Sequence, residues 1–289
     1  VTGAVSSASS AAAELDMAVQ MTQQSAKEAF TMVENYFQSL EPRLHSARVI
    51  GEFLEHYTLY HQLLSASYNV GGPSAGYALA INTLSAILQL PVWNDFGITG
   101  APWTKGVKKG EVGGSVIIGG HKKKTEKVLL HLRRMYMPLK NYMDLEQTFL
   151  VNYWSQGKDI LGVTHFGDLV PEVACLDDAY AKALEELIEM RIAYKMAKYK
   201  GNMPPDGLKE QILKSKEDLR QMLEKEIRNR LAALRHYLRT PGRDPHISLE
   251  EIYRSKPYAI ENLISPFRRI MDRLGRRRRN PVGEKAPPP

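Results

Sequence analysis

Apolar positions recur at helical and strand-like intervals through the first part of the chain. Leu15, Val33 and Phe37 belong to a run with helical spacing, and residues 57–70, rich in Tyr, Leu and Val, favour a strand. Residues 74–90 are again helical in pattern, and Pro91 ends them. Further strands are expected at 95–99, 113–118, from Tyr136 and at 162–165, with helices at 121–134 and 168–176. This alternation predicts an α+β (α/β) domain.

The pattern changes after Asp178. Residues 179–200 and 208–239 are strongly helical, and Ser248 with Glu251 forms a capping box before a further short helix. The chain is therefore expected to have four parts: a Ser- and Ala-rich linker (1–13), the mixed domain (14–178), an all-helical extension (179–262) and a basic, Pro-rich C-terminal tail (263–289).

A serine lies where the expected strand gives way to the apolar helix. Ser74 stands at the start of that helix, where backbone N–H groups are unpaired and can hold a developing oxyanion. Small neighbours let a substrate backbone approach. The position suits a nucleophile that attacks a carbonyl, provided that a base lies near. A plain helix cap is the alternative for a serine at this position.

Three consecutive lysines open the helix expected at 121–134. A lysine acts as a base only when it is neutral, which requires burial or nearby positive charge. Helical spacing places Lys124 on one face with Val128 and Leu132, whereas Lys122 lies over Glu126 and Lys123 over Lys127. Lys124 is therefore the candidate base, and an exposed lysine-rich helix start is the alternative.

These segments resemble, in order and register, the proteolytic domain of Lon proteases. Gly72 to Gly76 matches the Gly-Pro-Ser-Ala-Gly motif with the family's nucleophilic serine, and Gly119 to Lys124 matches a Gly-Leu-Lys-Glu-Lys-like motif that ends on its catalytic lysine. Thr99 matches a threonine that supports the dyad. Weaker similarity at residues 21–26 and 136–144 extends the resemblance over roughly residues 14 to 178.

The resemblance implies a serine endopeptidase that acts on polypeptide substrates. Ser74 would be the nucleophile and Lys124 its base, with Thr99 holding the pair in place. The small residues beside the nucleophile would form the oxyanion and substrate-binding site: Gly72, Pro73, Ala75 and Gly76. Gly71 and Ala101 stand where the family often has acidic residues, which leaves open a Lon-type domain whose activity is reduced or lost.

Positive charge is concentrated at the C-terminus. The chain has a net charge of +7, and nearly all of it lies after Ile264, where Lys285 accompanies seven arginines: Arg268, Arg269, Arg273, Arg276, Arg277, Arg278 and Arg279. Such a run suits phosphate contacts, although a solvated tail is the common alternative. A second expected function follows: a structural or assembly subunit of a mitochondrial ribosome or another ribonucleoprotein that keeps a Lon-type domain.

The long helices after Asp178 suggest a hairpin that either packs on its own domain or binds a protein partner. Its seam is expected to contain Leu184, Leu187, Ile188, Ile192, Met196, Leu213, Leu219, Leu223, Ile227, Leu231 and Leu234. The single cysteine, Cys175, fits a reducing compartment, so the mitochondrial matrix is expected, with the cytoplasm as the alternative.

Cofactor motifs are not recognisable in the sequence. The eight histidines form no ligand-spaced cluster, so no metal is expected. A Walker-type phosphate loop is also missing, so ATP would be involved only if an ATPase module precedes Val1 or a partner supplies one. No apolar run reaches the roughly 18 residues of a membrane span.

Overall fold

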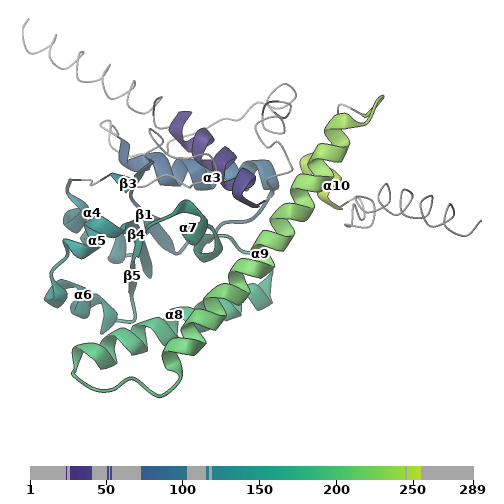
Figure 1. Ribbon diagram of the computed structural model, residues 1–289. Coiled ribbons are helices and arrows are strands. Elements are labelled where there is room, and N and C mark those ends of the chain that lie inside the picture. Colours follow the sequence, from purple (N-terminus) through teal and green to yellow (C-terminus); the bar gives the residue numbers. More distant parts are fainter. Residues whose placement is uncertain are drawn as a thin grey trace, which may run out of the picture. The chain divides into compact units, whose positions relative to one another are not determined.

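Helices and a small parallel sheet make up the computed structural model of the chain (Figure 1). The structure describes residues 24, 27–40, 51, 53, 73–102, 115–116, 119–244 and 246–254. The chain forms two compact units, Val1–Ile227 and Arg228–Pro289. The predictions for the linker, for the strand at 57–70, for Gly72 and for the basic tail lie outside the described residues.

Three parallel strands form the sheet of the first unit. They are β1 (Phe96–Ile98), β4 (Arg134–Pro138) and β5 (Asp159–Val163), with β4 in the middle. Every residue of β4 is buried, as expected for a central parallel strand that is covered on both faces. A separate antiparallel pair joins β2 (Ala101–Pro102) to β3 (Ser115–Val116). The mixed α and β architecture agrees with the sequence.

Helices connect and cover these strands. In chain order they are a helix over residues 27–40, the 3-10 turn η1 (Pro73–Ala75), α3 (Gly76–Leu88), α4 (His121–Leu129), α5 (Leu139–Met143), α6 (Gln147–Trp154), α7 (Phe166–Val173), α8 (Asp178–Tyr199), α9 (Leu208–Arg239) and α10 (Leu249–Arg254). The long helices α8 and α9 follow their predicted ranges closely. Asp177 caps α8 by accepting a hydrogen bond from Tyr180 N.

Several element boundaries were predicted wrongly; α7, for example, ends at Val173 rather than at Leu176. Helix α4 ends at Leu129 rather than at Arg134, and Arg134 is instead the first residue of β4. The backbone N–H groups of Arg133 and Arg134 both donate to Asp95 O, which draws this segment alongside the start of β1. Strand β5 likewise begins at Asp159, three positions before the predicted Gly162.

Different side chains occupy the two faces of the sheet. On one face, Met135, Met137 and Ile160 form an apolar cluster with Leu129 of α4 and with Leu145, Leu150 and Trp154 at and beside α6. Helices α4, α5 and α6 lie on that side, and α7 lies on the other (Figure 1). On the α7 side, Tyr136 donates from its hydroxyl to Glu172 O at 3.3 Å.

The predicted hairpin residues Ile192 and Met196 pack against the apolar cluster, so α8 packs on its own domain. The prediction that Leu213 belongs to the buried seam of the hairpin was wrong, because 58% of Leu213 is exposed.

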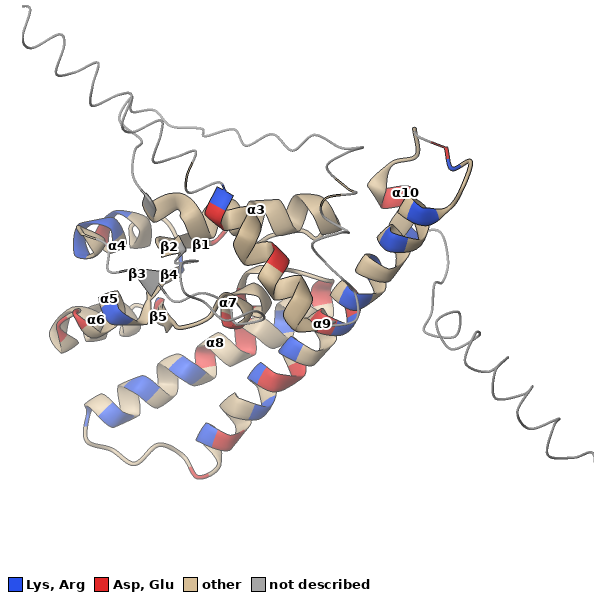
Figure 2. Cartoon of the chain, turned by 45° about the horizontal axis from the view of Figure 1, so that its top comes forward, with Lys and Arg blue, Asp and Glu red and all other residues tan. Residues whose placement is uncertain are grey.

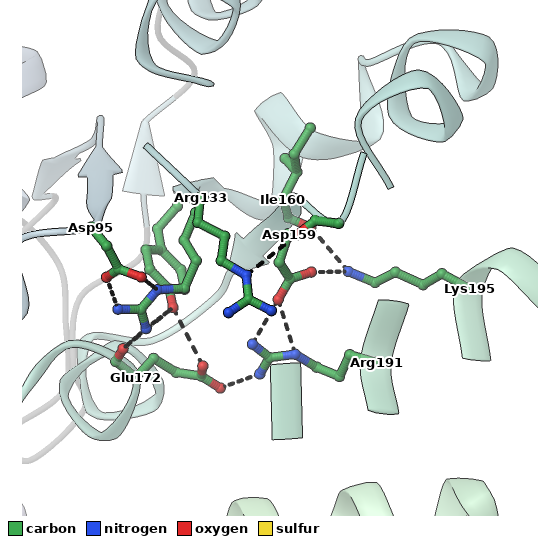
Figure 3. Close-up of polar contacts among 10 residues, drawn as sticks. Asp95, Arg133, Asp159, Ile160, Glu172, Arg191 and Lys195 are labelled. Atoms are coloured by element: carbon green, nitrogen blue, oxygen red, sulfur yellow. Dashed lines mark hydrogen bonds and ion pairs between the residues drawn. The ribbon is translucent and has the colours of Figure 1, made fainter. Parts of the chain in front are cut away.

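Buried charges tie α7 and α8 to the amino ends of the strands (Figure 3). Arg191 of α8 bridges Asp159 at 2.7 Å and Glu172 at 2.5 Å, and Lys195 also bonds Asp159, at 2.8 Å. Arg134 pairs with Asp95 and donates to Glu172 O at 2.8 Å. Although burial opposes ionisation of Asp159, these cations outweigh it and hold the pKa of Asp159 at about 2.

The second unit contains the end of α9 and the short helix α10. Ser248 and Glu251 form the predicted capping box, in which Glu251 N donates to Ser248 Oγ and Ser248 N to Glu251 Oε2. The Arg230 guanidinium lies 5.6 Å from the ring centre of Tyr253, which joins the two helices. Among the helices described in either unit, none has both the length and the apolar composition needed to cross a membrane.

Candidate functional site

The sequence-predicted site residues gather at the carboxyl end of the parallel strands. Thr99 follows β1 directly, and Asn141 lies in α5, which follows β4. Helix α4 ends shortly before β4 begins, so its last turn lies near the amino ends of the strands and its first turn near their carboxyl ends. Ligands and catalytic groups of open parallel sheets commonly lie at this carboxyl edge.

Backbone hydrogen bonds hold Ser74 beside the end of β1. Gly100 N donates to Ser74 O at 2.9 Å, and Tyr77 N donates to Gly100 O at 3.1 Å. Thr99 N donates to Tyr136 O at 3.0 Å and thereby extends the pairing of β1 with β4. The turn with Ser74 and the strand end with Thr99 are therefore one hydrogen-bonded unit.

Gly100 is required for this close approach. A Cβ atom at Gly100 would lie 2.0 Å from Cδ2 and 2.5 Å from Cε2 of Tyr77, whose ring is 1% exposed. Any larger residue would have to displace that buried ring and the first turn of α3 with it. The segment Ile98-Thr99-Gly100 is part of the resemblance in the sequence, but the close approach of Gly100 to the Tyr77 ring depends on the fold and is not visible in the sequence pattern.

The segment around Ser74 is a 3-10 turn followed at once by α3. Ser74 and Ala75 are half-buried and Gly76 is buried, while the side chain of Pro73 is outside the described residues. No side chain caps α3 and its first turn contains no acidic residue, so negative charge at its N-terminus would come from outside the helix. Tyr77 N already donates to Gly100 O, which excludes it as a donor to an oxyanion.

Helix α4 brings Lys124 to the level of Thr99. Val128 covers Gly97 of β1 so closely that a Cβ there would lie 2.4 Å from Val128 Cγ1. Lys124 lies one turn, about 6 Å, N-terminal to Val128. Thr99 lies two residues, about 6.6 Å, beyond Gly97, and side-chain alternation directs it to the same face of the sheet. Thr99 is buried, with 4% of it exposed.

Burial separates Lys124 from its neighbours on α4. Lys124 is half-buried, whereas Lys122, Lys123 and Lys127 are exposed. Helical spacing predicted this difference between Lys124 and its two preceding lysines. Figure 2 marks the lysine-rich helix α4 in blue. Desolvation lowers the pKa of Lys124 below that of a free lysine. Lys122 is exposed and forms an ion pair with Glu146 at 3.3 Å.

The side chains of the expected dyad carry no competing ion pair. Across the described ranges, Lys124 Nζ has no carboxylate partner, and no hydrogen bond joins it to Ser74 Oγ. Hydrogen bonds between catalytic groups often form only when substrate binds, so an open pair of this kind is compatible with the chemistry. A hydroxyl at a helix start and a partly dehydrated amine supply a nucleophile and a base for acyl transfer.

One histidine beside Lys124 was not predicted to have a role. His121, the first residue of α4, contacts Asn141 Nδ2 through Nδ1 at 3.1 Å and Asp144 Oδ2 through Nε2 at 3.2 Å. Asn141 is fully buried. The signal was present in the sequence, because His121 stands where the resembled motif has leucine.

The sequence predicted no metal site and predicted nucleic-acid contacts through the tail arginines. No group of three His, Cys, Asp or Glu side chains suited to a metal occurs among the residues whose positions are described. The seven tail arginines, from Arg268 to Arg279, lie outside those residues. No protein-family model matches the chain, and no curated protein matches it significantly.

Proposed function

We propose that the chain is a Lon-like serine endopeptidase with a Ser74/Lys124 dyad. The observation that carries the proposal is the arrangement at the carboxyl end of β1. There, Gly100 holds Ser74 beside Thr99, and α4 brings a partly dehydrated Lys124 to the same level. The resemblance of the two motifs to the Lon proteolytic domain implies the same residues.

The mechanism begins with a proton transfer. Neutral Lys124 takes the proton of Ser74 Oγ, and the oxygen attacks the carbonyl carbon of a peptide bond to form a tetrahedral oxyanion. Collapse of this intermediate breaks the C–N bond, and Lys124 returns the proton to the leaving amine, which leaves an acyl group on Ser74. Water then attacks the acyl-enzyme with the same amine as base, which regenerates the hydroxyl. Thr99 positions the pair throughout.

Cleavage of fluorescently labelled, denatured casein tests the proposal. Ser74→Ala and Lys124→Ala should each lose cleavage, because one removes the nucleophile and the other the base. Lys123→Ala is the matched control: its side chain is exposed on the same helix, so cleavage should be retained. Cleavage by the Ser74→Ala protein at the wild-type rate would refute the assignment.

A second role is proposed for the tail because most of the net charge lies there. Seven arginines after Ile264 suit binding to the phosphates of an RNA, in keeping with a subunit of a mitochondrial ribosome or another ribonucleoprotein. Removal of residues 263–289 should weaken binding to a labelled ribosomal RNA fragment and reduce its salt dependence. Equal binding and an equal salt slope for the shortened chain would contradict this role.

A further inference from the structure

We propose that His121 is a positioning residue that fixes the first turn of α4 and thereby the place of Lys124. This inference rests on the proposed function, because it assigns a role beside the same dyad. It starts from how weakly the beginning of α4 is otherwise held. Gly120 occupies the cap position with φ +70°, and no side chain caps the helix.

The two glycines before His121 give the helix start little packing. Gly119 and Gly120 are exposed, and a Cβ at either would meet no atom of the described residues within 4 Å. Lys124 N donates to Gly120 O at 3.1 Å, so Lys124 closes the first turn and moves with it. An unanchored first turn would fray and expose the Lys124 amine to water.

His121 supplies the missing anchor. Its side chain is 13% exposed and reaches α5, which follows β4 directly. The Asn141 amide donates from Nδ2 to Nδ1, and Nε2 faces the Asp144 carboxylate. The backbone of His121 also contributes, since Thr125 Oγ1 donates to its carbonyl at 2.9 Å and the Thr125 side chain is fully buried.

These contacts also exclude His121 as the base. Both ring nitrogens are engaged with residues on α5 or just after it, so neither is available to take a proton from Ser74. The ring instead joins the helix that carries Lys124 to the strand that Thr99 pairs with. Because a 1 Å displacement of a catalytic group can cost on the order of 100-fold in rate, such an anchor matters even without contact to substrate.

Two substitutions separate the hydrogen bonds from the bulk of the ring. Glutamine offers an oxygen that can accept from Asn141 and an N–H that can donate to Asp144, whereas leucine fills space without either bond. His121→Leu should therefore lower kcat for casein cleavage on the order of 10-fold or more with little change in KM, and His121→Gln should restore most of the rate. The control is His131→Leu, the same change at an exposed position just after α4, which should have no effect.

A second measurement does not depend on activity. In protein labelled with ¹³C-lysine, the Cε resonance that disappears in Lys124→Arg reports the titration of Lys124. In His121→Leu, the pKa of Lys124 obtained from this titration should rise toward that of an exposed lysine. In His121→Gln, the pKa should stay near the wild-type value. Asp144→Ala, at a position whose side chain is 73% exposed, should give a smaller shift in the same direction and tests the anchor without risk to folding.

The outcomes separate the two proposals. Full cleavage by Ser74→Ala refutes the dyad, while the Lys124 titration still decides whether His121 holds the helix start. Loss of cleavage in Ser74→Ala, together with a wild-type rate and titration in His121→Leu, overturns the positioning role alone. A defect in His121→Gln as large as in His121→Leu would also overturn it, because the hydrogen bonds would then not be the cause.

Discussion

Replacing Asp159 by asparagine should destabilise the first unit strongly. Asp159 begins β5, is 2% exposed and accepts hydrogen bonds from Arg191 at 2.7 Å and from Lys195 at 2.8 Å (Figure 3). Asparagine keeps the shape but removes the negative charge. Arg191 would retain only Glu172 as a carboxylate partner, and Lys195 would lose its ion pair.

The magnitude follows from the lowered pKa. A fall from 3.8 to about 2 corresponds to on the order of 2 kcal/mol of stability at neutral pH. Breaking a buried ion pair by removing one partner costs roughly 3–5 kcal/mol in other proteins. Because the asparagine oxygen can still accept a hydrogen bond, the expected loss in unfolding free energy is about 3 kcal/mol.

The pH dependence has a definite sign. A depressed carboxylate pKa contributes stability that is fully present above the unfolded value near 4 and is lost as the pH falls through about 2. The difference in stability between wild type and Asp159→Asn should therefore be constant from pH 7 to about 4 and shrink toward pH 2. Carboxylates that do not contact Arg191 or Lys195 titrate alike in both proteins, so they cancel from this difference.

Urea unfolding followed by tryptophan fluorescence measures this difference. All three tryptophans precede Ile227, and Trp154 lies under Lys195 with its ring centre 5.5 Å from Nζ, so the signal reports the first unit. Asp206→Asn is the control, since Asp206 is exposed between α8 and α9 and should change stability by less than about 0.5 kcal/mol. This explanation would be refuted if Asp159→Asn were as stable as this control and if its difference in unfolding free energy from wild type did not shrink at low pH.

Three further predictions concern the site and the second unit. Because burial lowers the pKa of Lys124, casein cleavage should rise with pH and level off below the roughly 10.4 of a free lysine; a rate that still climbs through that value would contradict a shielded base. Gly100→Ala should cost about 1–3 kcal/mol and most of the cleavage through the Tyr77 ring, measured against Gly119→Ala, whose new methyl group meets open space. Ser248→Ala should cost about 1 kcal/mol and speed hydrogen exchange in α10 while leaving cleavage unchanged; unaltered exchange would mean that the capping box is unimportant.

Local patterns in the sequence located much of the secondary structure. The ranges of α8 and α9, the capping box at Ser248 and the shielding of Lys124 all depend on residues within one or two helical turns of each other. Relations between residues this close in sequence can be recognised from the spacing of residue types along the chain. They also identified the turn before α3, although α3 itself begins at Gly76 after a 3-10 turn.

Errors arose where distant residues decide the structure. Arg134 follows a lysine- and arginine-rich helix and was expected to end it, but Asp95, far away in sequence, pairs with its guanidinium inside the protein. The strand predicted at 162–165 began too late for the same reason, because the cations that pair with Asp159 come from α8. The role of Gly100 depends on the Tyr77 ring, and that of His121 on α5. A local pattern gives no information on such partners.

The register of α4 explains why only one of its lysines can serve the proposed reaction. Thr125 and Leu129 are fully buried and Val128 lies on Gly97, which fixes the rotation of the helix about its axis. At about 100° per residue, Lys124 lies about 40° around the helix from Val128, whereas Lys122 and Lys123 lie about 120° and 140° from it, and both are exposed. Of the three lysines, Lys124 is therefore the one that shares the side of α4 that Val128 presents to β1, and it is also the one that is half-buried. The buried side chains of α4, rather than the number of lysines, select Lys124.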